Sequence, residues 1–268
     1  MKKIIYLFSI TFLILQSCSS DNSSDSNSNN NPLVLVKSMT KSFLGSSGQI
    51  VQTYNYFYNN AKIDHIDYSF NNGSNMIETG KIVYTYNENL ISKIEGFGSD
   101  NVLDFRYTYI YNNSNQVLEC NQFWINDVNN SYYHSHKKIF TYNIDSTVSE
   151  LYYEGTPNNP VQLVKKYTYT IVGGEIVSTI EANPNGYIVK STNYSFDNKN
   201  YPFKNIIGNN LFLQNDGSGY NFNVIQEIVN YSTTSNTKNF TITYNSNNYP
   251  ISIISSSTNN IAQSFTYY

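Results

Sequence analysis

The feature of this sequence that most constrains its fold is a short aromatic motif that recurs along the chain. In one copy, Tyr84-Thr85-Tyr86-Asn87 is followed by the aliphatic residues Leu90, Ile91 and Ile94. Similar units begin at Tyr56, Tyr109, Phe140, Tyr167, Tyr194 and Ile242, and a half-unit begins at Phe265. The units recur every 23 to 31 residues, apart from one gap of 48 residues. Each therefore has room for two strands and two turns, which predicts a series of β-hairpins.

Composition supports an all-β fold. The chain contains 26 Tyr, 16% aromatic residues in total and many Asn; Tyr, Thr, Ile and Val favour strands, whereas Asn favours turns. The repeats would supply roughly fourteen to sixteen strands, and sheets of more than about ten strands tend to curl. We expect an antiparallel meander of tandem β-hairpin repeats over residues 35–268, strongly twisted and curled or partly closed.

Two further expectations concern this sheet. The long gap between Leu211 and Ser235 should hold an additional irregular hairpin. A transmembrane β-barrel is disfavoured, because strands that face lipid need an apolar band of about nine to eleven residues, and these units are short, polar and interrupted by Asn.

The N-terminus reads as a lipoprotein signal peptide over residues 1–17. Two lysines precede an apolar run that is too short to span a bilayer, and small residues lead to Cys18. We expect Cys18 to be lipidated and residues 18–34 to form a disordered Ser/Asn/Asp tether. An ordinary secretory signal is the alternative. The predicted location is the outer membrane, with the chain lipid-anchored and exposed at the surface, and the membrane is its predicted partner through Cys18.

The repeats also resemble a known family. The tandem Tyr-x-Tyr-Asn units are similar to the YD-repeat group related to Rhs proteins. The segment from Asp197 to Asn210, followed by Tyr244-Asn245 and Tyr249-Pro250-Ile251, resembles an uncharacterised Bacteroidetes lipoprotein domain family. The Gly-Arg that usually follows the YD repeat is missing, so a toxin-enclosing shell is not implied. The resemblance implies fold style and an envelope location, and no catalytic residues.

Candidate binding residues lie around the only tryptophan. Trp124, with Tyr132 and Tyr133, is a candidate platform for stacking a sugar ring, although a packed core aromatic is the commoner role of such a residue. His134 and His136 would share one face of a strand and are candidate metal ligands if Asp127 or Glu119 approaches; exposed strand histidines are the alternative. Cys120 is expected to be a buried, unreactive side chain.

No sequence pattern supports catalysis. The chain has no nucleophile elbow, zinc-protease motif or phosphate-binding loop, and Glu150 and Glu154 are expected at solvated positions. No cofactor is implied, and a net charge of −3 offers no surface for nucleic acid. We predict a non-catalytic envelope lipoprotein that binds an extracellular or envelope ligand such as a polysaccharide. A structural or protein-interaction role is the alternative, and a metal-dependent enzyme is less favoured.

Overall fold

The computed structural model describes residues 33–45, 48–71, 73, 77–126, 131–155, 162–209, 212, 221–256 and 261–268. For residues 126 and 131–134 it describes the backbone alone. The chain divides into a unit of residues 1–33 and a compact unit of residues 34–268. No helix in the described ranges is long and apolar enough to cross a membrane. The predicted signal peptide, Cys18 and most of the tether lie outside the described residues and stay predictions.

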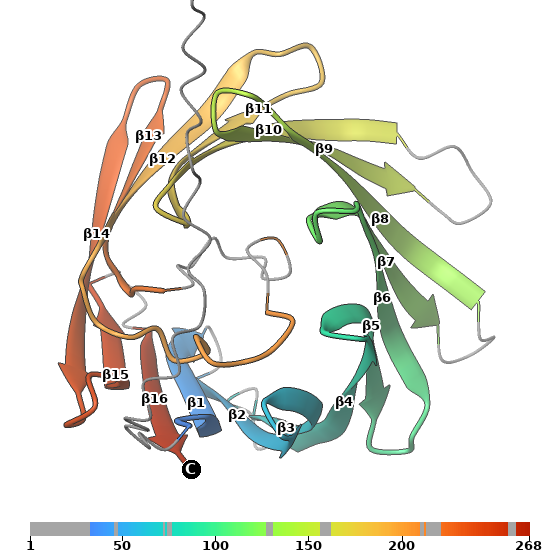
Figure 1. Ribbon diagram of the computed structural model, residues 1–268, viewed down its shortest axis with the longest axis vertical. Helices are drawn as coiled ribbons and strands as arrows, with labels where there is room; N and C mark the ends of the chain where they lie inside the picture. Colours follow the sequence, from blue (N-terminus) through green and yellow to red (C-terminus); the bar gives the residue numbers. More distant parts are fainter. Residues whose placement is uncertain are drawn as a thin grey trace, which may run out of the picture. The chain divides into compact units, whose positions relative to one another are not determined.

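The second unit is built from antiparallel strands alone within the described residues (Figure 1). The strands are β1 (Val36–Gly45), β2 (Gly48–Asn59), β3 (Lys62–Asn71), β4 (Ile77–Asn87), β5 (Leu90–Gly98), β6 (Leu103–Tyr111), β7 (Val117–Asn126), β8 (Ser131–Tyr142), β9 (Thr147–Gly155), β10 (Gln162–Val172), β11 (Glu175–Ala182), β12 (Ile188–Phe196), β13 (Val224–Tyr231), β14 (Ser235–Tyr244), β15 (Pro250–Ser255) and β16 (Ala262–Tyr267).

Each strand pairs with the next along the chain, and β1 pairs with β16 to close a barrel. In this closing pair Met39 lies opposite Phe265 and Lys41 lies opposite Gln263. The all-β class, the antiparallel meander and the strand number expected from the repeats are confirmed. Full closure goes beyond the expected curled or partly closed sheet, because the repeats contain no signal for pairing the first strand with the last.

The repeated motif has a structural role at the turns between hairpin strands. In several copies its second Tyr lies beside a register shift, as at Phe57/Tyr58 and Thr85/Tyr86. From there the hydroxyl reaches the backbone of the preceding hairpin. The hydroxyls of Tyr58, Tyr111, Tyr142 and Tyr267 donate to the carbonyls of Val36, Ile91, Val117 and Pro250 at 2.6–3.1 Å, and that of Tyr86 accepts from the Ile63 amide at 3.0 Å. The tyrosines thus brace consecutive hairpins.

We expect Tyr111→Phe to lower the free energy of unfolding by about 0.5–1.5 kcal/mol, because it removes the 2.7 Å hydrogen bond to the Ile91 carbonyl. Urea denaturation measures the change. Tyr107→Phe is the matched control, because the Tyr107 hydroxyl makes no hydrogen bond with any described residue. An equal loss in the two variants would contradict the bracing role.

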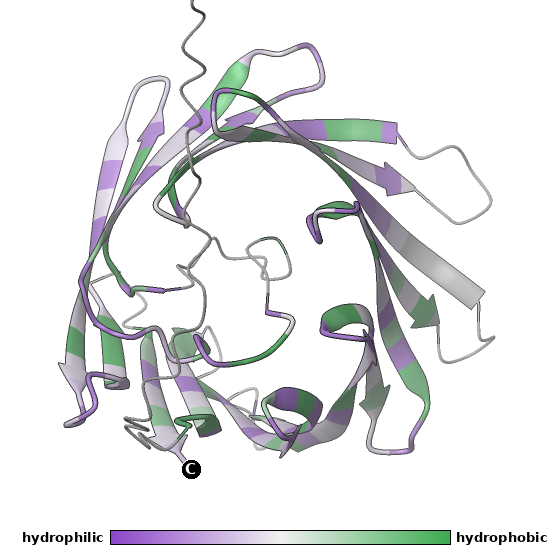
Figure 2. Ribbon diagram, viewed as in Figure 1, coloured by the Kyte–Doolittle hydropathy of each residue, from purple (hydrophilic) through white to green (hydrophobic). Residues whose placement is uncertain are grey.

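Apolar and polar residues alternate along many strands (Figure 2). The buried apolar side chains point into the barrel, whereas some apolar strand residues, such as Ile110, Ile251 and Ile254, are exposed. Two clusters of buried residues fill part of the interior. On β14 the alternation is regular: Thr237, Asn239, Thr241 and Thr243 are exposed, and the residues between them are half-buried. On β14 the outward side chains are therefore polar, and the inward ones are apolar or aromatic apart from Lys238.

A segment between β12 and β13 folds into the interior of the barrel (Figure 1). We call residues 197–209 the lumenal segment. Within it, the Ile207 amide donates to the Ala61 carbonyl at 2.9 Å, and the Asn205 side-chain amide donates to the Val34 carbonyl and the Tyr249 hydroxyl, both at 2.8 Å. The segment is thereby fixed to the residues just before β1 and to the turns after β2 and β14.

The sequence-based interpretation of this region was partly wrong. Residues 201–206 were expected to form the second strand of a repeat, but they form turns. Pro202 cannot donate a ladder hydrogen bond. Instead, Ile206 is buried in a core cluster and Phe203 packs against that cluster. The additional hairpin expected in the long gap is not seen in the described residues. They supply one strand there, β13, which pairs with β12 and with β14, the first strand of the next repeat.

Candidate functional site

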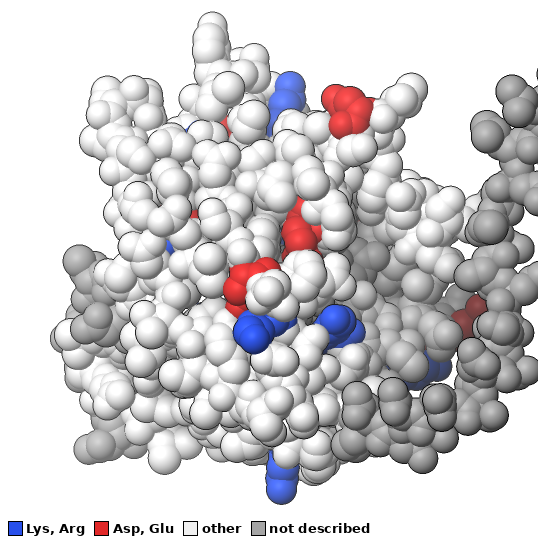
Figure 3. Space-filling view, turned by 60° about the vertical axis from the view of Figure 1, so that its left-hand side comes forward, with Lys and Arg blue, Asp and Glu red and all other residues white. Residues whose placement is uncertain are grey.

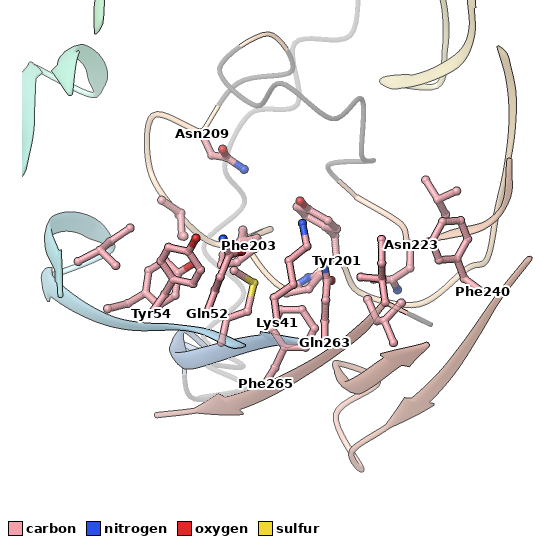
Figure 4. Close-up of a pocket in the computed structure, with 18 of the residues that line it drawn as sticks. Lys41, Gln52, Tyr54, Tyr201, Phe203, Asn209, Asn223, Phe240, Gln263 and Phe265 are labelled. Atoms are coloured by element: carbon pink, nitrogen blue, oxygen red, sulfur yellow. The ribbon is translucent and has the colours of Figure 1, made fainter. Parts of the chain in front are cut away.

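The barrel interior contains a cavity of about 540 Å³ (Figure 4). Its walls come from strands at both ends of the chain, including β1, β2, β14 and β16, and from the lumenal segment. Most of the lining is apolar or aromatic: Met39, Tyr54, Tyr56, Ile63, Ile66, Tyr84, Ile91, Ile94, Tyr194, Tyr201, Phe203, Ile206, Phe240, Ile253 and Phe265. Such a cavity favours an apolar molecule over water.

The floor of the cavity is set by aromatic contacts between the lumenal segment and the wall. The Phe203 ring lies 5.5 Å from that of Tyr56 and 6.2 Å from that of Phe265, measured between centroids. Tyr56 and Phe265 are 6% and 5% exposed. Because both sides of the floor are packed aromatic rings, the floor is formed before any ligand enters.

Polar groups are few and are placed on particular walls. Lys41, Gln52 and Gln263 line the cavity from β1, β2 and β16. Glu227 and Lys238 lie on β13 and β14 and face one another, with 3.9 Å between Oε2 and Nζ.

Asn223 supplies a further polar atom to the lining. Its side-chain amide donates to Asp197 and to backbone carbonyls of the lumenal segment. Asn223 Oδ1 is the one buried side-chain oxygen or nitrogen in the described residues without a hydrogen-bond partner. Its position on the cavity wall offers an acceptor to a water molecule or a ligand hydroxyl group.

Burial keeps the inner tyrosines uncharged. It raises the pKa of Tyr86, Tyr107 and Tyr142 to about 12, so their hydroxyls remain protonated near neutral pH. Burial likewise raises the pKa of the Cys120 thiol to about 11. Cys120 is 1% exposed, which confirms the expected buried and unreactive side chain.

Glu150 lies inside the barrel, away from the cavity, and is 3% exposed. The expected solvated position was wrong, because the inward-facing register of β9 places Glu150 opposite Phe140 and Tyr167. The Tyr169 hydroxyl donates to Glu150 Oε2 at 2.7 Å. Burial raises the pKa of this carboxyl, and Lys138 and Tyr169 offset only part of the rise.

This carboxyl makes stability depend on pH. Because its pKa is higher in the folded state, the folded state is favoured below the ordinary glutamate pKa and loses stability as the pH rises through the raised value. We expect Glu150→Gln to remove that loss, so its stability relative to the unaltered protein increases from acidic to neutral pH. Urea denaturation at several pH values measures the difference.

Glu119 on β7 provides a control, because its contribution to stability changes with pH in the opposite direction. Burial raises its pKa, but the Lys137 ammonium at 2.7 Å and Asn121 outweigh this and hold the pKa below its ordinary value. Glu119 therefore contributes stability that is lost as the pH falls through its lowered pKa, and Glu119→Gln should become less stable relative to the unaltered protein as the pH rises. The same trend in both variants would contradict our assignment of Glu150.

The predicted binding residues are only partly within the described structure. The Trp124 ring packs 5.5 Å from the Phe105 ring and does not line the cavity. The side chains of Tyr132, Tyr133 and His134 lie outside the described residues. His136 lies 3.8 Å from Glu154, between Nε2 and Oε1, and its ring stacks near Tyr152.

Metal binding at His134 and His136 stays a prediction. Across the described ranges, no three His, Cys, Asp or Glu side chains gather closely enough to hold a metal ion. Sequence reasoning missed the cavity residues Lys41, Gln52 and Gln263. β1 lies before the first repeat, so no periodic signal marked Lys41.

Comparisons with known proteins provide a structural likeness only. No family model matches the sequence, and no curated protein matches it. A porin-like protein from Bacteroides uniformis superposes with a TM-score of 0.53 and 10% identity over 87% of this chain and 98% of that chain. The fold is that of a porin-like barrel. A second porin-like protein, from Bacteroides vulgatus, has a TM-score of 0.52 and 13% identity over 88% of this chain and 99% of that chain.

The porin-like fold overturns two sequence-based predictions. The resemblance to YD-repeat and Rhs-related lipoprotein domains was wrong, because the hairpins join edge to edge into one closed barrel. The predicted polysaccharide-binding repeat module, with its structural, protein-interaction and metal-enzyme alternatives, was also wrong. Tyrosines exposed on the sheet would have favoured such a module, whereas the repeated tyrosines of this porin-like barrel point inward.

Proposed function

We propose that this protein is a porin-like barrel of the outer membrane that binds an apolar small molecule in its interior. The observation that carries the proposal is the cavity of about 540 Å³ lined mainly by aromatic and aliphatic side chains of the wall and of the lumenal segment. Small-molecule sites in proteins usually have volumes of about 300–1,000 Å³ and a mostly apolar lining with a few polar groups. Porin-like barrels are typically non-enzymatic, so we propose a non-catalytic role.

The outer-membrane location rests on two supports. The signal peptide and Cys18 predict a lipid anchor, and both structural neighbours are porin-like proteins from Bacteroides. With such an anchor, the barrel does not need to span the bilayer and is surrounded by water at the membrane surface. The polar side chains and ion pairs on its outer face are compatible with that position.

Ion pairs on the outer face agree with contact to water. On β5 and β6, Glu95 accepts from Lys93 at 2.6 Å and from Arg106 at 2.8 Å, while their neighbour Ile94 is buried inside. The face of β13 and β14, which comes forward in Figure 3, carries few charged side chains, but its outward residues are mainly Thr and Asn. Membrane-spanning barrels have the reverse arrangement, with an apolar band outside.

An outer-membrane channel is the second candidate. Closure of the barrel and the likeness to porin-like proteins favour it. Against it, a Lys or Arg facing the middle of a bilayer costs about 2–4 kcal/mol, and the lumenal segment occupies part of the interior. The binding proposal accounts for the apolar interior, which an aqueous channel does not require.

Titration with the neutral fluorescent probe N-phenyl-1-naphthylamine tests the proposal. We expect the purified protein to bind it with a dissociation constant of about 1–100 µM. Ile253→Trp should weaken binding because the indole ring would occupy the cavity. Ile254→Trp, at the neighbouring position on the outer face, is the matched control and should leave the affinity unchanged.

Planar-bilayer recording separates the two candidates. We expect no stepwise conductance from the purified protein. Stepwise conductance without probe binding would overturn the proposal in favour of a channel, and probe binding that is unaffected by Ile253→Trp would place binding outside the cavity.

A further inference from the structure

Three polar side chains form one row across the seam where the barrel closes. Lys41 on β1 lies directly opposite Gln52 on β2 and directly opposite Gln263 on β16. Residues in direct register point to the same face of a sheet, and all three line the cavity, where Figure 4 shows Lys41 pointing inward. One ammonium group is therefore flanked by two side-chain amides.

The row has no partner among the residues that the structure describes. Neither Lys41, Gln52 nor Gln263 makes a hydrogen bond or ion pair with any side chain or backbone group that the structure describes. The other charges on the cavity wall, Glu227 and Lys238, face each other at 3.9 Å. The donors of the row are thus available to a molecule inside the cavity.

The next row toward the floor is apolar. Met39 lies opposite Tyr54 and opposite Phe265, and the Phe203 ring packs on Phe265 with a centroid distance of 6.2 Å. A positively charged row thus borders an aromatic floor along the same three strands. Within the reach of one small molecule, the wall therefore offers both a charged row and an apolar row.

We propose that the ligand is an amphipathic organic anion, with an apolar or aromatic body and one carboxylate or sulfonate group. Its body lies on Met39, Tyr54 and Phe265. Its anionic group accepts a charge-assisted hydrogen bond from Lys41 Nζ and hydrogen bonds from the Gln52 and Gln263 amides. This inference rests on the proposed function, since it specifies which apolar molecules the cavity selects.

A pair of fluorescent probes separates the anionic contact from apolar binding. N-phenyl-1-naphthylamine is neutral, and 8-anilinonaphthalene-1-sulfonate has the same ring system with one sulfonate group. In Lys41→Met we expect the dissociation constant of the sulfonate to rise about tenfold, because a charge-assisted hydrogen bond is lost. The affinity for the neutral probe should change less than about twofold, because methionine preserves the apolar part of the side chain.

Lys81→Met is the control, since Lys81 pairs loosely with Asp67 on the outer face and its loss should leave both affinities unchanged. An unchanged sulfonate affinity in Lys41→Met, or an equal weakening of both probes, would overturn the anion site while leaving the proposed function in place. Failure of the unaltered protein to bind the neutral probe would overturn both.

Discussion

Phe140→Ala is expected to lower the free energy of unfolding by about 3–5 kcal/mol, a large share of the 5–15 kcal/mol typical of a folded domain. Phe140 is 3% exposed and lies in the buried cluster with Cys120 and Val148. Its ring packs 4.9 Å from that of Phe212, which reaches the wall from the connection between β12 and β13. Truncation leaves a void that the rigid wall cannot close.

Urea denaturation followed by circular dichroism measures this loss. Thr141→Ala is the matched control, because Thr141 is the next residue along β8 and is exposed on the outer face; its effect should stay within about 0.5 kcal/mol. If Phe140→Ala lowers the free energy of unfolding by less than about 1 kcal/mol, this cluster does not hold the barrel wall to the connection between β12 and β13.

Asp197→Ala should lower the free energy of unfolding by about 2–4 kcal/mol, because it leaves buried donors without an acceptor. Asp197 Oδ1 accepts from the Asn223 amide at 3.0 Å, and Oδ2 accepts from Asn223 Nδ2 at 3.1 Å. The Tyr244 hydroxyl also donates to Oδ2. Asn223 is 2% exposed, so water cannot replace the lost acceptor without rearrangement.

The same variant should release the lumenal segment, because Asp197 and Asn223 join its first residue to the start of β13. We expect faster hydrogen exchange at the Tyr201 and Ile207 amides. Asp145→Ala is the control: Asp145 also accepts from a turn amide, at Thr147, but it is solvent-exposed, and its loss should have a much smaller effect. Unchanged exchange at Ile207 in Asp197→Ala would contradict the anchoring role.

The hairpins were predictable from sequence because their signals are local. The motif Tyr84-Thr85-Tyr86-Asn87 predicted a strand and turn, and β4 ends at Asn87 with β5 beginning at Leu90. The predicted Asn turns are also present: Asn60, Asn115 and Asn248 have φ near 60°, a conformation that Asn adopts more readily than most residues. Likewise Gly173 and Gly174, both with positive φ, form a tight turn between β10 and β11.

Closure and the direction of the two faces were not predictable. Alternation places Tyr54 and Thr53 on opposite faces, but it does not say which face will be inside. Which face lies inside is decided by closure of the barrel, which pairs Met39 with Phe265, two residues near opposite ends of the sequence. Without that pairing, the sequence did not determine whether the tyrosines face inward or outward.

The candidate site was hidden for the same reason. Lys41, Gln52 and Gln263 are ordinary polar residues in sequence, and β1 and β16 come together only when the barrel closes. Trp124, the only tryptophan, was a candidate binding residue in the sequence, but its ring packs on Phe105. In a closed barrel, the chemistry of the interior depends on which distant strands become neighbours.

The pairing of β1 with β16 also imposes an order on folding. Until β16 has emerged and docked, the growing sheet has two open edges, β1 and β15, whose unpaired amides and carbonyls can join other chains. The closing contact is the most distant in sequence and is made by a strand of only six residues, so it forms late. The last strand is therefore the part of the molecule on which protection from aggregation depends during folding.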